Sequence, residues 1–222
     1  RREALAAPLL GQLAPALGAG AAGAFPNRIY DVDEKKKPGK LPSNLGAVPR
    51  SPGAPPDLAG CGRAPNCFSS AAASEYNTFR FAPEVEKAHQ LEPWRYSSGG
   101  PAAAFADVER VVRAYKPGQR GIDGGGFQVV KADAAKGYLY AQFESVKFGY
   151  IDDVEFLVRG DAEGQAGEVR VRSASRQGFL DFGVNAKRLN YIAEGLNGLE
   201  GGRWSAPALS NERYPDYVQQ NR

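Results

Sequence analysis

Seven charged residues between positions 152 and 188 have the types and the spacing that acid–base chemistry needs. Paired carboxylates can act as acid and base, while arginines beside them orient an anionic substrate. The same residues can instead form a lattice of arginine–carboxylate pairs that ties the central strands to the last helix. We favour the lattice, because arginine pairs bidentately with carboxylates and the two signs of charge are nearly balanced. The seven residues are Asp152, Asp153, Glu155, Arg172, Arg176, Asp181 and Arg188.

Three other patterns that carry chemistry are incomplete in this chain. The two serines of the segment 172–176 lack the Gly-x-Ser-x-Gly context of a nucleophile elbow, and no signal places the single histidine near them. The glycines 124–126 lack the Lys-Ser/Thr of a phosphate-binding loop, so they are expected to form a turn. The acidic residues of 152–155 could bind a hard cation, but strand alternation separates Asp152 from the other two. We expect no catalytic residue, no cofactor and no metal.

The two cysteines are the next reactive pair. Cys61 and Cys67 stand six positions apart around a Pro-Asn turn, and a disulfide is the economical interpretation. Such a bond requires an oxidising compartment. Two buried free thiols and a redox pair remain alternatives, although the spacing is not Cys-x-x-Cys.

Composition excludes several classes of protein. The chain has 222 residues and a formal charge of +3. Residues 1–56 carry eight Lys/Arg against four Asp/Glu, so the rest is close to neutral and a nucleic-acid-binding protein is not expected. With one His and two Cys, a Cys/His ligand shell has at most three members, which excludes a zinc finger or an iron–sulfur protein.

The N-terminal third differs from the rest in composition. Residues 1–24 begin with Arg1-Arg2 and continue as a weakly apolar run ending in small residues, which predicts a twin-arginine-like signal or a retained membrane anchor. A low-complexity linker is the alternative. Residues 25–60 are predicted to be an extended Pro-rich linker. Because it lacks a core of its own, we expect it to gain order by docking on another surface. The docking residues would be Ile29, Tyr30, Lys35, Lys36, Lys37, Leu41, Leu45 and Val48.

Hydrophobic periodicity then predicts the elements that position the charged residues. Helical spacing is expected over 101–115 and again over 184–196. Strand-like runs joined by short turns favour antiparallel neighbours, because a parallel return needs a dozen or more residues. The fold class is therefore α+β: an antiparallel sheet of four or more strands covered by about two helices, preceded by the Pro-rich arm. The strand-like runs are 127–131, 138–148, 151–158 and 168–173.

Three separated motifs resemble the domain-of-unknown-function family 1499, in its thylakoid-lumen type from photosynthetic eukaryotes. They are the Cys61-x5-Cys67 pair with Pro-Asn before and Ser-Ser after the second Cys, the run Phe148–Phe156, and the run Arg172–Arg188. His89 stands where the family's His-x-x-x-Pro element is expected. The resemblance spans about residues 58–197, which implies a family domain over 61–200 and a C-terminal tail over 201–222. It implies a thylakoid-lumen location but supplies no established reaction.

These observations lead to three functional hypotheses. The first is a non-catalytic, membrane-associated factor in the thylakoid lumen of the chloroplast. It would dock on photosystem II core subunits during assembly, repair or stabilisation, and contact the thylakoid membrane through its N-terminal segment. The second is a binding protein for a lipid, pigment or quinone in an apolar cavity lined by sheet aromatics. The third, a hydrolase or isomerase using the Asp/Arg cluster, is the least favoured. The aromatics are Phe127, Tyr138, Tyr140, Phe143, Phe148, Tyr150 and Phe156.

Overall fold

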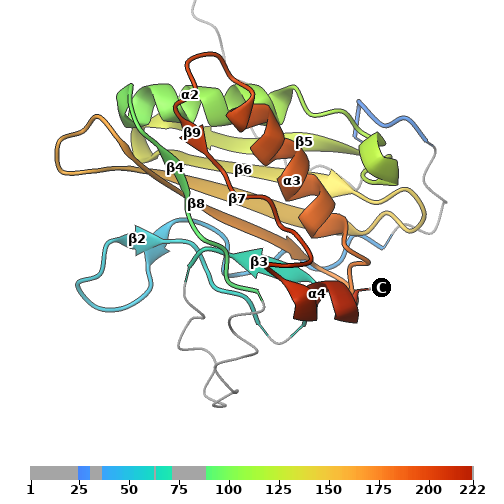
Figure 1. Cartoon of the computed structure of the whole chain (residues 1–222). Coiled ribbons are helices and arrows are strands. Elements are labelled where there is room, and N and C mark those ends of the chain that lie inside the picture. Colours follow the sequence, from blue (N-terminus) through green and yellow to red (C-terminus); the bar gives the residue numbers. More distant parts are fainter. Residues whose placement is uncertain (1–24, 31–36, 63, 72–88, 222) are drawn as a thin grey trace, which may run out of the picture.

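The computed structural model describes residues 25–30, 37–62, 64–71 and 89–221. In this part of the chain seven strands form one sheet in the order β5-β6-β7-β8-β4-β9, and β3 also pairs with β8 (Figure 1). A second sheet holds only β1 (Val48–Pro49) and β2 (Pro56–Asp57). The large sheet contains β3 (Cys67–Ser69), β4 (Trp94–Tyr96), β5 (Gly126–Asp133), β6 (Tyr138–Glu144), β7 (Ile151–Gly160), β8 (Gly167–Ser175) and β9 (Trp204–Ser205).

The four long strands β5 to β8 are consecutive antiparallel neighbours. Their short connections leave no room for a crossover, which is the reason that the sequence favours this topology. The β7–β8 register places Glu155 directly opposite Arg172. The predicted α+β fold is confirmed, with one difference in bounds: the run expected over 138–148 ends as a strand at Glu144, and a turn occupies 145–150.

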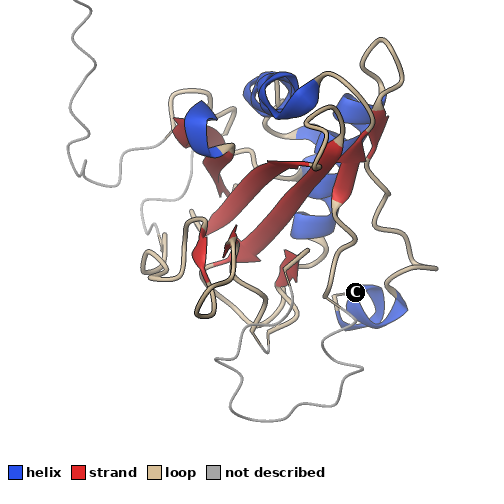
Figure 2. Ribbon diagram, turned by 90° about the vertical axis from the view of Figure 1, so that its left-hand side faces the viewer, coloured by secondary structure: helices blue, strands red, loops and turns tan. Residues whose placement is uncertain are grey.

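Helices α2 (Gly100–Arg113) and α3 (Val184–Asn197) pack on one face of the sheet (Figure 2). Pro at the start of α2 suits the first turn, where no intrahelical donor is needed. The core between helices and sheet includes Val108 and Val112 from α2, Ile192 from α3, and Phe156 and Val171 from the sheet. This face therefore carries the main hydrophobic core.

The opposite face of the sheet is covered by the N-terminal arm of the same chain. Leu45 and Ala47 pack on a smaller apolar cluster that contains Leu58, Tyr138 and Leu157. Gly46 N–H also donates a 2.7 Å hydrogen bond to the carboxylate of Glu155. Part of the segment expected to dock elsewhere is thus ordered by its own sheet.

The C-terminal region expected as a tail over 201–222 contains β9 and the short helix α4 (Pro215–Gln220). Trp204 is buried and its indole N–H donates to Asp107 on α2 over 2.8 Å. Tyr214 and Tyr217 pack against Phe68 of β3. The region therefore contributes to the main core instead of trailing from it.

Among the described residues, no helix has both the length and the apolar character needed to cross a membrane. The predicted signal or anchor over 1–24 and the predicted docking residues Lys35 and Lys36 lie outside the described residues.

Candidate functional site

The seven charged residues of the candidate site separate into two groups on opposite faces of the sheet. Alternation along β7 directs Asp152 toward the helices, and directs Asp153 and Glu155 toward the arm. Asp152 pairs with Arg188 of α3, whereas Glu155 pairs with Arg172. The seven residues therefore cannot line one common cleft.

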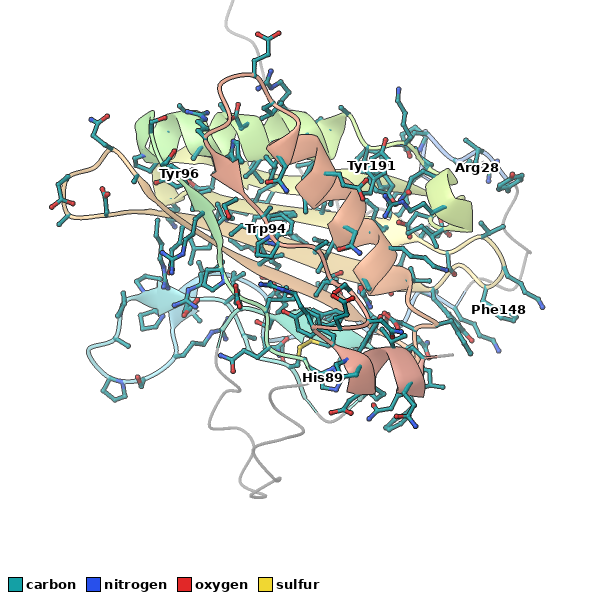
Figure 3. The ribbon with its side chains drawn as sticks, in the orientation of Figure 1. Arg28, His89, Trp94, Tyr96, Phe148 and Tyr191 are labelled. Carbon is teal, nitrogen blue, oxygen red and sulfur yellow. A yellow bond between two sulfur atoms is a disulfide. The ribbon has the colours of Figure 1, made fainter. Side chains whose placement is uncertain are left out.

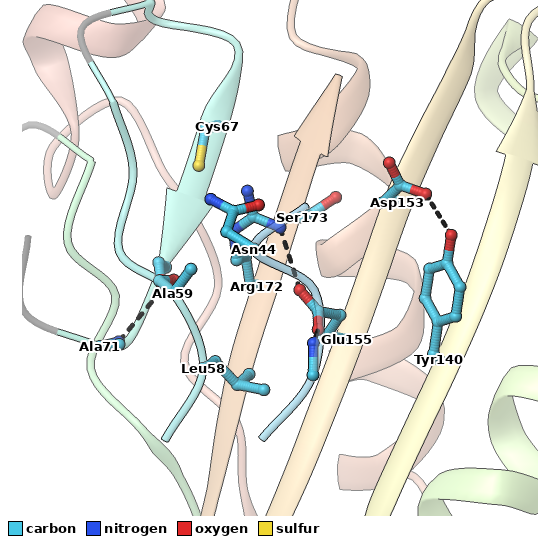
Figure 4. A network of polar contacts seen from close by, with 12 residues as sticks. Asn44, Leu58, Ala59, Cys67, Ala71, Tyr140, Asp153, Glu155, Arg172 and Ser173 are labelled. Atoms are coloured by element: carbon cyan, nitrogen blue, oxygen red, sulfur yellow. Dashed lines mark hydrogen bonds and ion pairs between the residues drawn. The ribbon is translucent and has the colours of Figure 1, made fainter. Parts of the chain in front are cut away.

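On the arm-covered face, two rows of polar side chains run from β6 across β7 to β8 and the residue after it. Figure 4 shows the Tyr140–Asp153 contact of one row and the Arg172–Glu155 contact of the other. In the first row, the Tyr138 hydroxyl donates to Glu155 over 2.7 Å and Arg172 donates to the same carboxylate over 2.9 Å. In the second row, Tyr140 donates to Asp153, and Arg176 forms a bidentate pair with it over 2.8 and 2.7 Å. Each carboxylate thus accepts bonds from a tyrosine and an arginine.

These two rows are closed off from water. Asp153 and Glu155 are fully buried, and the arm places Gly46 over Glu155. Burial, followed by the adjacent carboxylate, raises the pKa of both Tyr138 and Tyr140, so these hydroxyls stay protonated and remain donors. The two rows link β6 and β7 to β8 and the residue after it, and the bond from Gly46 to Glu155 joins the arm to the first row.

On the helix-covered face, Arg188 is the centre of a second cluster. Its guanidinium donates to Asp123 over 2.8 and 2.5 Å and to Asp152 over 2.7 Å, and it lies over the Phe143 ring. Burial alone would lower the pKa of Arg188, but the two carboxylates outweigh burial and raise that pKa well above its usual value. Tyr115 also donates to Asp123. The cluster ties α3 to β7 and to the turn before β5.

Asp181 has a different role from the one predicted. Its carboxylate accepts hydrogen bonds from the backbone N–H of Gly183 and Asn185 and from the Tyr217 hydroxyl, over 2.7 to 3.0 Å. Among the described residues, Asp181 therefore does not form the expected pair with an arginine. Its carboxylate instead satisfies free N–H groups at the start of α3. Burial raises the pKa of Asp181 against these hydrogen bonds.

The expectation that all three arginines join the sheet to the last helix is also wrong in part. Only Arg188, which is itself on α3, makes that connection. Arg172 of β8 and Arg176, which directly follows that strand, lie on the other face, where they pair with Glu155 and Asp153 of β7. The pairs Arg172–Glu155, Arg176–Asp153 and Arg188–Asp152 do occur within the predicted set.

Several members of the two charge clusters were not identified from the sequence. Asp123 lies 65 positions from Arg188 in a glycine-rich turn with no periodic pattern. Tyr138 and Tyr140 could have been identified as members, because they alternate along β6 in step with Glu155 and Asp153 on β7. In the described part of the chain, no group of three or more His, Cys, Asp or Glu side chains is placed to hold a metal ion.

The predicted disulfide is confirmed. Cys61 and Cys67 are joined at an S–S distance of 2.09 Å with their Cα atoms 5.7 Å apart. Cys67 begins β3, so the bond fixes the turn that leads into the strand beside β8.

Replacing both cysteines with serine is expected to lower the free energy of unfolding by roughly 2 kcal/mol, because a short loop is no longer closed in the unfolded chain. Urea unfolding of the oxidised protein and of the double variant measures this difference. The double variant Cys61→Ala with Cys67→Ala is the control for effects of the serine hydroxyls, and it should lose a similar amount. Equal unfolding midpoints for the oxidised protein and both double variants would contradict the expectation.

The predicted docking residues of the arm are mostly exposed. Ile29, Tyr30, Leu41 and Val48 each leave between 43% and 56% of their surface accessible. Leu45 instead packs on the chain's own sheet. Lys37 is exposed, and its backbone N–H donates to the Phe148 carbonyl over 2.9 Å. The arm therefore has one side held by the sheet and another side open.

His89 is buried beside β3 and α4 (Figure 3). Its ring lies 6.3 Å from Phe68 and 6.2 Å from Tyr217, between ring centroids. Burial lowers the pKa of His89 below the ordinary 6.5, and a hydrogen bond to the Cys67 backbone and the charge of Asp181 offset burial only in part. The neutral imidazole is therefore the form that the fold accommodates.

The imidazole of His89 binds a proton more tightly in the unfolded chain than in the folded protein. The free energy of unfolding is therefore expected to fall as pH decreases from about 7.5 to about 5.5. Asp181, whose pKa is raised, contributes with the opposite sign, so the histidine is isolated by comparison with His89→Gln. Urea midpoints across this pH range should fall more steeply for the native protein than for the variant. Identical slopes would show that His89 protonates equally well in both states.

A surface groove of about 470 Å³ lies between α2 and α3. Its lining includes Val111 of α2, Ala114 directly after that helix, and Tyr191 and Gly195 of α3, with Arg110 and Glu194 as charged members. The sheet aromatics expected to line an enclosed cavity are used differently. Phe127, Phe143 and Phe156 belong to the main core, and Tyr138 and Tyr140 belong to the arm-covered cluster.

Comparison with known proteins identifies a family. No curated protein and no solved structure matches the chain. One family, described as a protein of unknown function (DUF1499), matches residues 57–196. This range begins just before the disulfide and ends within α3, so it includes both charge clusters described above. The chain belongs to the DUF1499 family.

Proposed function

We propose that the protein is a non-catalytic accessory factor of the thylakoid lumen that docks on photosystem II core subunits during assembly, repair or stabilisation. The observation that carries the proposal is the arm, which is anchored to the sheet through Leu45 and Gly46 while it exposes Leu41 and Val48. An ordered segment with exposed apolar side chains is suited to bind a partner, because little further ordering entropy is lost on binding.

Two further observations support this proposal. The disulfide suits an oxidising compartment such as the lumen. The buried carboxylates of the two clusters are engaged by arginines and tyrosines, which is the arrangement of a structural lattice. In this proposal the N-terminal segment provides contact with the thylakoid membrane, and nucleic acid is not a partner.

The proposal is tested with the full chain carrying Leu41→Ser and Val48→Ser. Both side chains are exposed, so the fold should survive. Co-purification with photosystem II should fall by about tenfold or more, since full burial of a large apolar side chain contributes about 1.5–3 kcal/mol and roughly half of each of these two surfaces is still exposed. The matched control is Leu41→Met with Val48→Ile, which keeps the apolar surface and should keep association. Undiminished association of the serine variant would reject docking through the arm.

The small-ligand hypothesis has one observation in its favour, the groove between α2 and α3. A volume of about 470 Å³ lies in the range of small-molecule sites, and the lining is largely apolar. Ala114→Trp would fill this exposed groove. If a lipid, pigment or quinone co-purified with the native protein and were lost in that variant, and the native protein did not associate with photosystem II, ligand binding would replace docking as the function.

A further inference from the structure

Large exposed apolar side chains gather at one end of the sheet, where β6 turns into β7 and where β8 ends. Phe148 lies in the first of these turns, and Phe179 and Phe182 lie in the loop between β8 and α3. Figure 3 shows Phe148 at this end together with Arg28 of the arm. Val48, by contrast, belongs to β1, whose partner β2 contacts Arg159 at the other end of β7.

Hydrogen bonds and close packing join these segments. Lys37 N–H donates to the Phe148 carbonyl over 2.9 Å, and Arg176 N–H donates to the Ile151 carbonyl over 3.1 Å. Gly39 packs so closely that a Cβ there would lie 2.7 Å from the Cβ of Arg176. The arm, the β6–β7 turn and the β8–α3 loop therefore form one continuous surface.

The backbone at Phe182 is held in an unfavourable conformation. Its φ of 54° lies in the left-handed region, which aromatic residues rarely adopt, and 67% of its surface is exposed. The N–H groups of Asp181 and Phe182 both donate to the side-chain oxygen of Asn221, over 2.9 and 3.1 Å. An exposed ring adds little to the core, so packing does not account for a phenylalanine at this position.

The charges around these rings are mainly positive. Lys40, Lys147 and Lys187 are exposed and form no ion pair with any other described residue, and Lys147 lies over the Phe148 ring. Within 37–43, 145–150 and 176–187 the only acidic residue is Asp181, which is buried. The neighbouring helix α4 carries Asp216. Residues 31–36, which include three acids and two lysines, lie outside the described part of the chain.

We infer that this aromatic end, defined by Phe148, Phe179, Phe182, Lys40, Lys147 and Lys187, binds the surface of an anionic lipid bilayer. The rings enter the headgroup region and the lysines meet the lipid phosphates. Exposed rings carried on two separate loops and flanked by lysines suit a fluid surface. A protein partner favours anchors clustered in one packed patch. The inference goes beyond the proposed function, because it requires no photosystem.

The test uses the full chain and vesicles of phosphatidylcholine, with or without phosphatidylglycerol. The native protein should bind the mixed vesicles more tightly and lose that preference in high salt. The double variant Phe179→Ser with Phe182→Asn should bind the mixed vesicles at least tenfold more weakly, because even partial burial of two rings contributes more than about 1.4 kcal/mol. Asparagine tolerates the left-handed backbone, so the melting temperature should be kept. Val48→Ser is the matched control and should bind like the native protein.

Lys147→Ser gives a second, independent measurement. Its affinity should fall by about fivefold for vesicles with phosphatidylglycerol and stay unchanged for phosphatidylcholine alone, because one lysine contributes about 1 kcal/mol at an anionic surface. Native-like vesicle binding by the phenylalanine variant would overturn the inference and assign binding to another segment. The inference would also be overturned if the phenylalanine variant kept its vesicle binding and lost only self-association or photosystem association. Neither vesicle result depends on whether the protein docks on a photosystem.

Discussion

Replacing Arg188 with methionine is expected to lower the free energy of unfolding by about 3–5 kcal/mol, the cost of leaving buried carboxylates without their cation. Arg188 is fully buried and is bonded to Asp123 and Asp152 at once. Methionine keeps much of the volume of the arginine side chain, so the loss of unfolding free energy arises from the missing charge and not from a cavity. Urea unfolding at neutral pH measures it.

The Arg188 variant should also have a distinctive pH dependence. Burial already raises the pKa of Asp123, and removing the guanidinium raises the folded-state pKa further. A folded pKa above the unfolded value means that protonation favours the native state, so the stability deficit should shrink as pH falls from neutral toward about 5. A deficit that stays constant over this range would argue against unpaired carboxylates as its cause.

Two control variants separate burial from charge. Arg120→Met breaks an exposed pair with Glu194 and should cost less than about 1 kcal/mol. Adding Asp123→Asn and Asp152→Asn to Arg188→Met should recover part of the loss, because the uncompensated charges disappear. An equal loss of unfolding free energy in Arg120→Met and Arg188→Met would show that the buried Arg188 cluster is not a major source of stability.

The second large effect is expected at Gly167, where alanine should cost about 3 kcal/mol. A Cβ at this position would overlap the carbonyl oxygen of Arg159 and the hydroxyl of Tyr96. The Tyr96 hydroxyl donates to that same carbonyl over 2.9 Å, so neither group can move without losing the bond. Thermal unfolding of Gly167→Ala compared with the native protein measures the effect.

Gly164→Ala is the matched control in the same hairpin. Gly164 has a φ of 70° and open space around the position of a Cβ. Its replacement should cost only about 1 kcal/mol through backbone strain. A larger loss at Gly164 than at Gly167 would mean that the β7–β8 turn, rather than the contact with β4, limits stability.

The sequence predicted the long elements well because their patterns are local. The apolar periods of 101–115 and 184–196 correspond to α2 and α3, and the short connections dictated antiparallel strands. It did not predict β4 or β9, which have three and two residues and no measurable period. Such short strands form because a neighbouring strand offers them a pairing partner, β8 for β4 and β4 for β9.

The candidate site was predicted in its members more than in its geometry. Arginines and carboxylates of opposite charge were paired as expected in three cases. Which face each side chain occupies depends on the strand register, and the register is set by distant packing. Asp123 could not be assigned to Arg188 because nothing in a glycine-rich turn indicates which helix will contact it.

The pairing of β8 with three other strands has a consequence for the order of folding. β8 binds β7 along its length, β3 near one end and β4 near the other. Ser70 and its partner Val171 are 101 positions apart, whereas a short turn joins β7 to β8, so the β7–β8 hairpin is expected to form before β3 and β4 dock on it. The Cys61–Cys67 loop, in contrast, spans six positions and can close at any time. Oxidation can therefore shape the β3 turn before the strand has anything to pair with, and late docking of that preformed turn would complete the sheet.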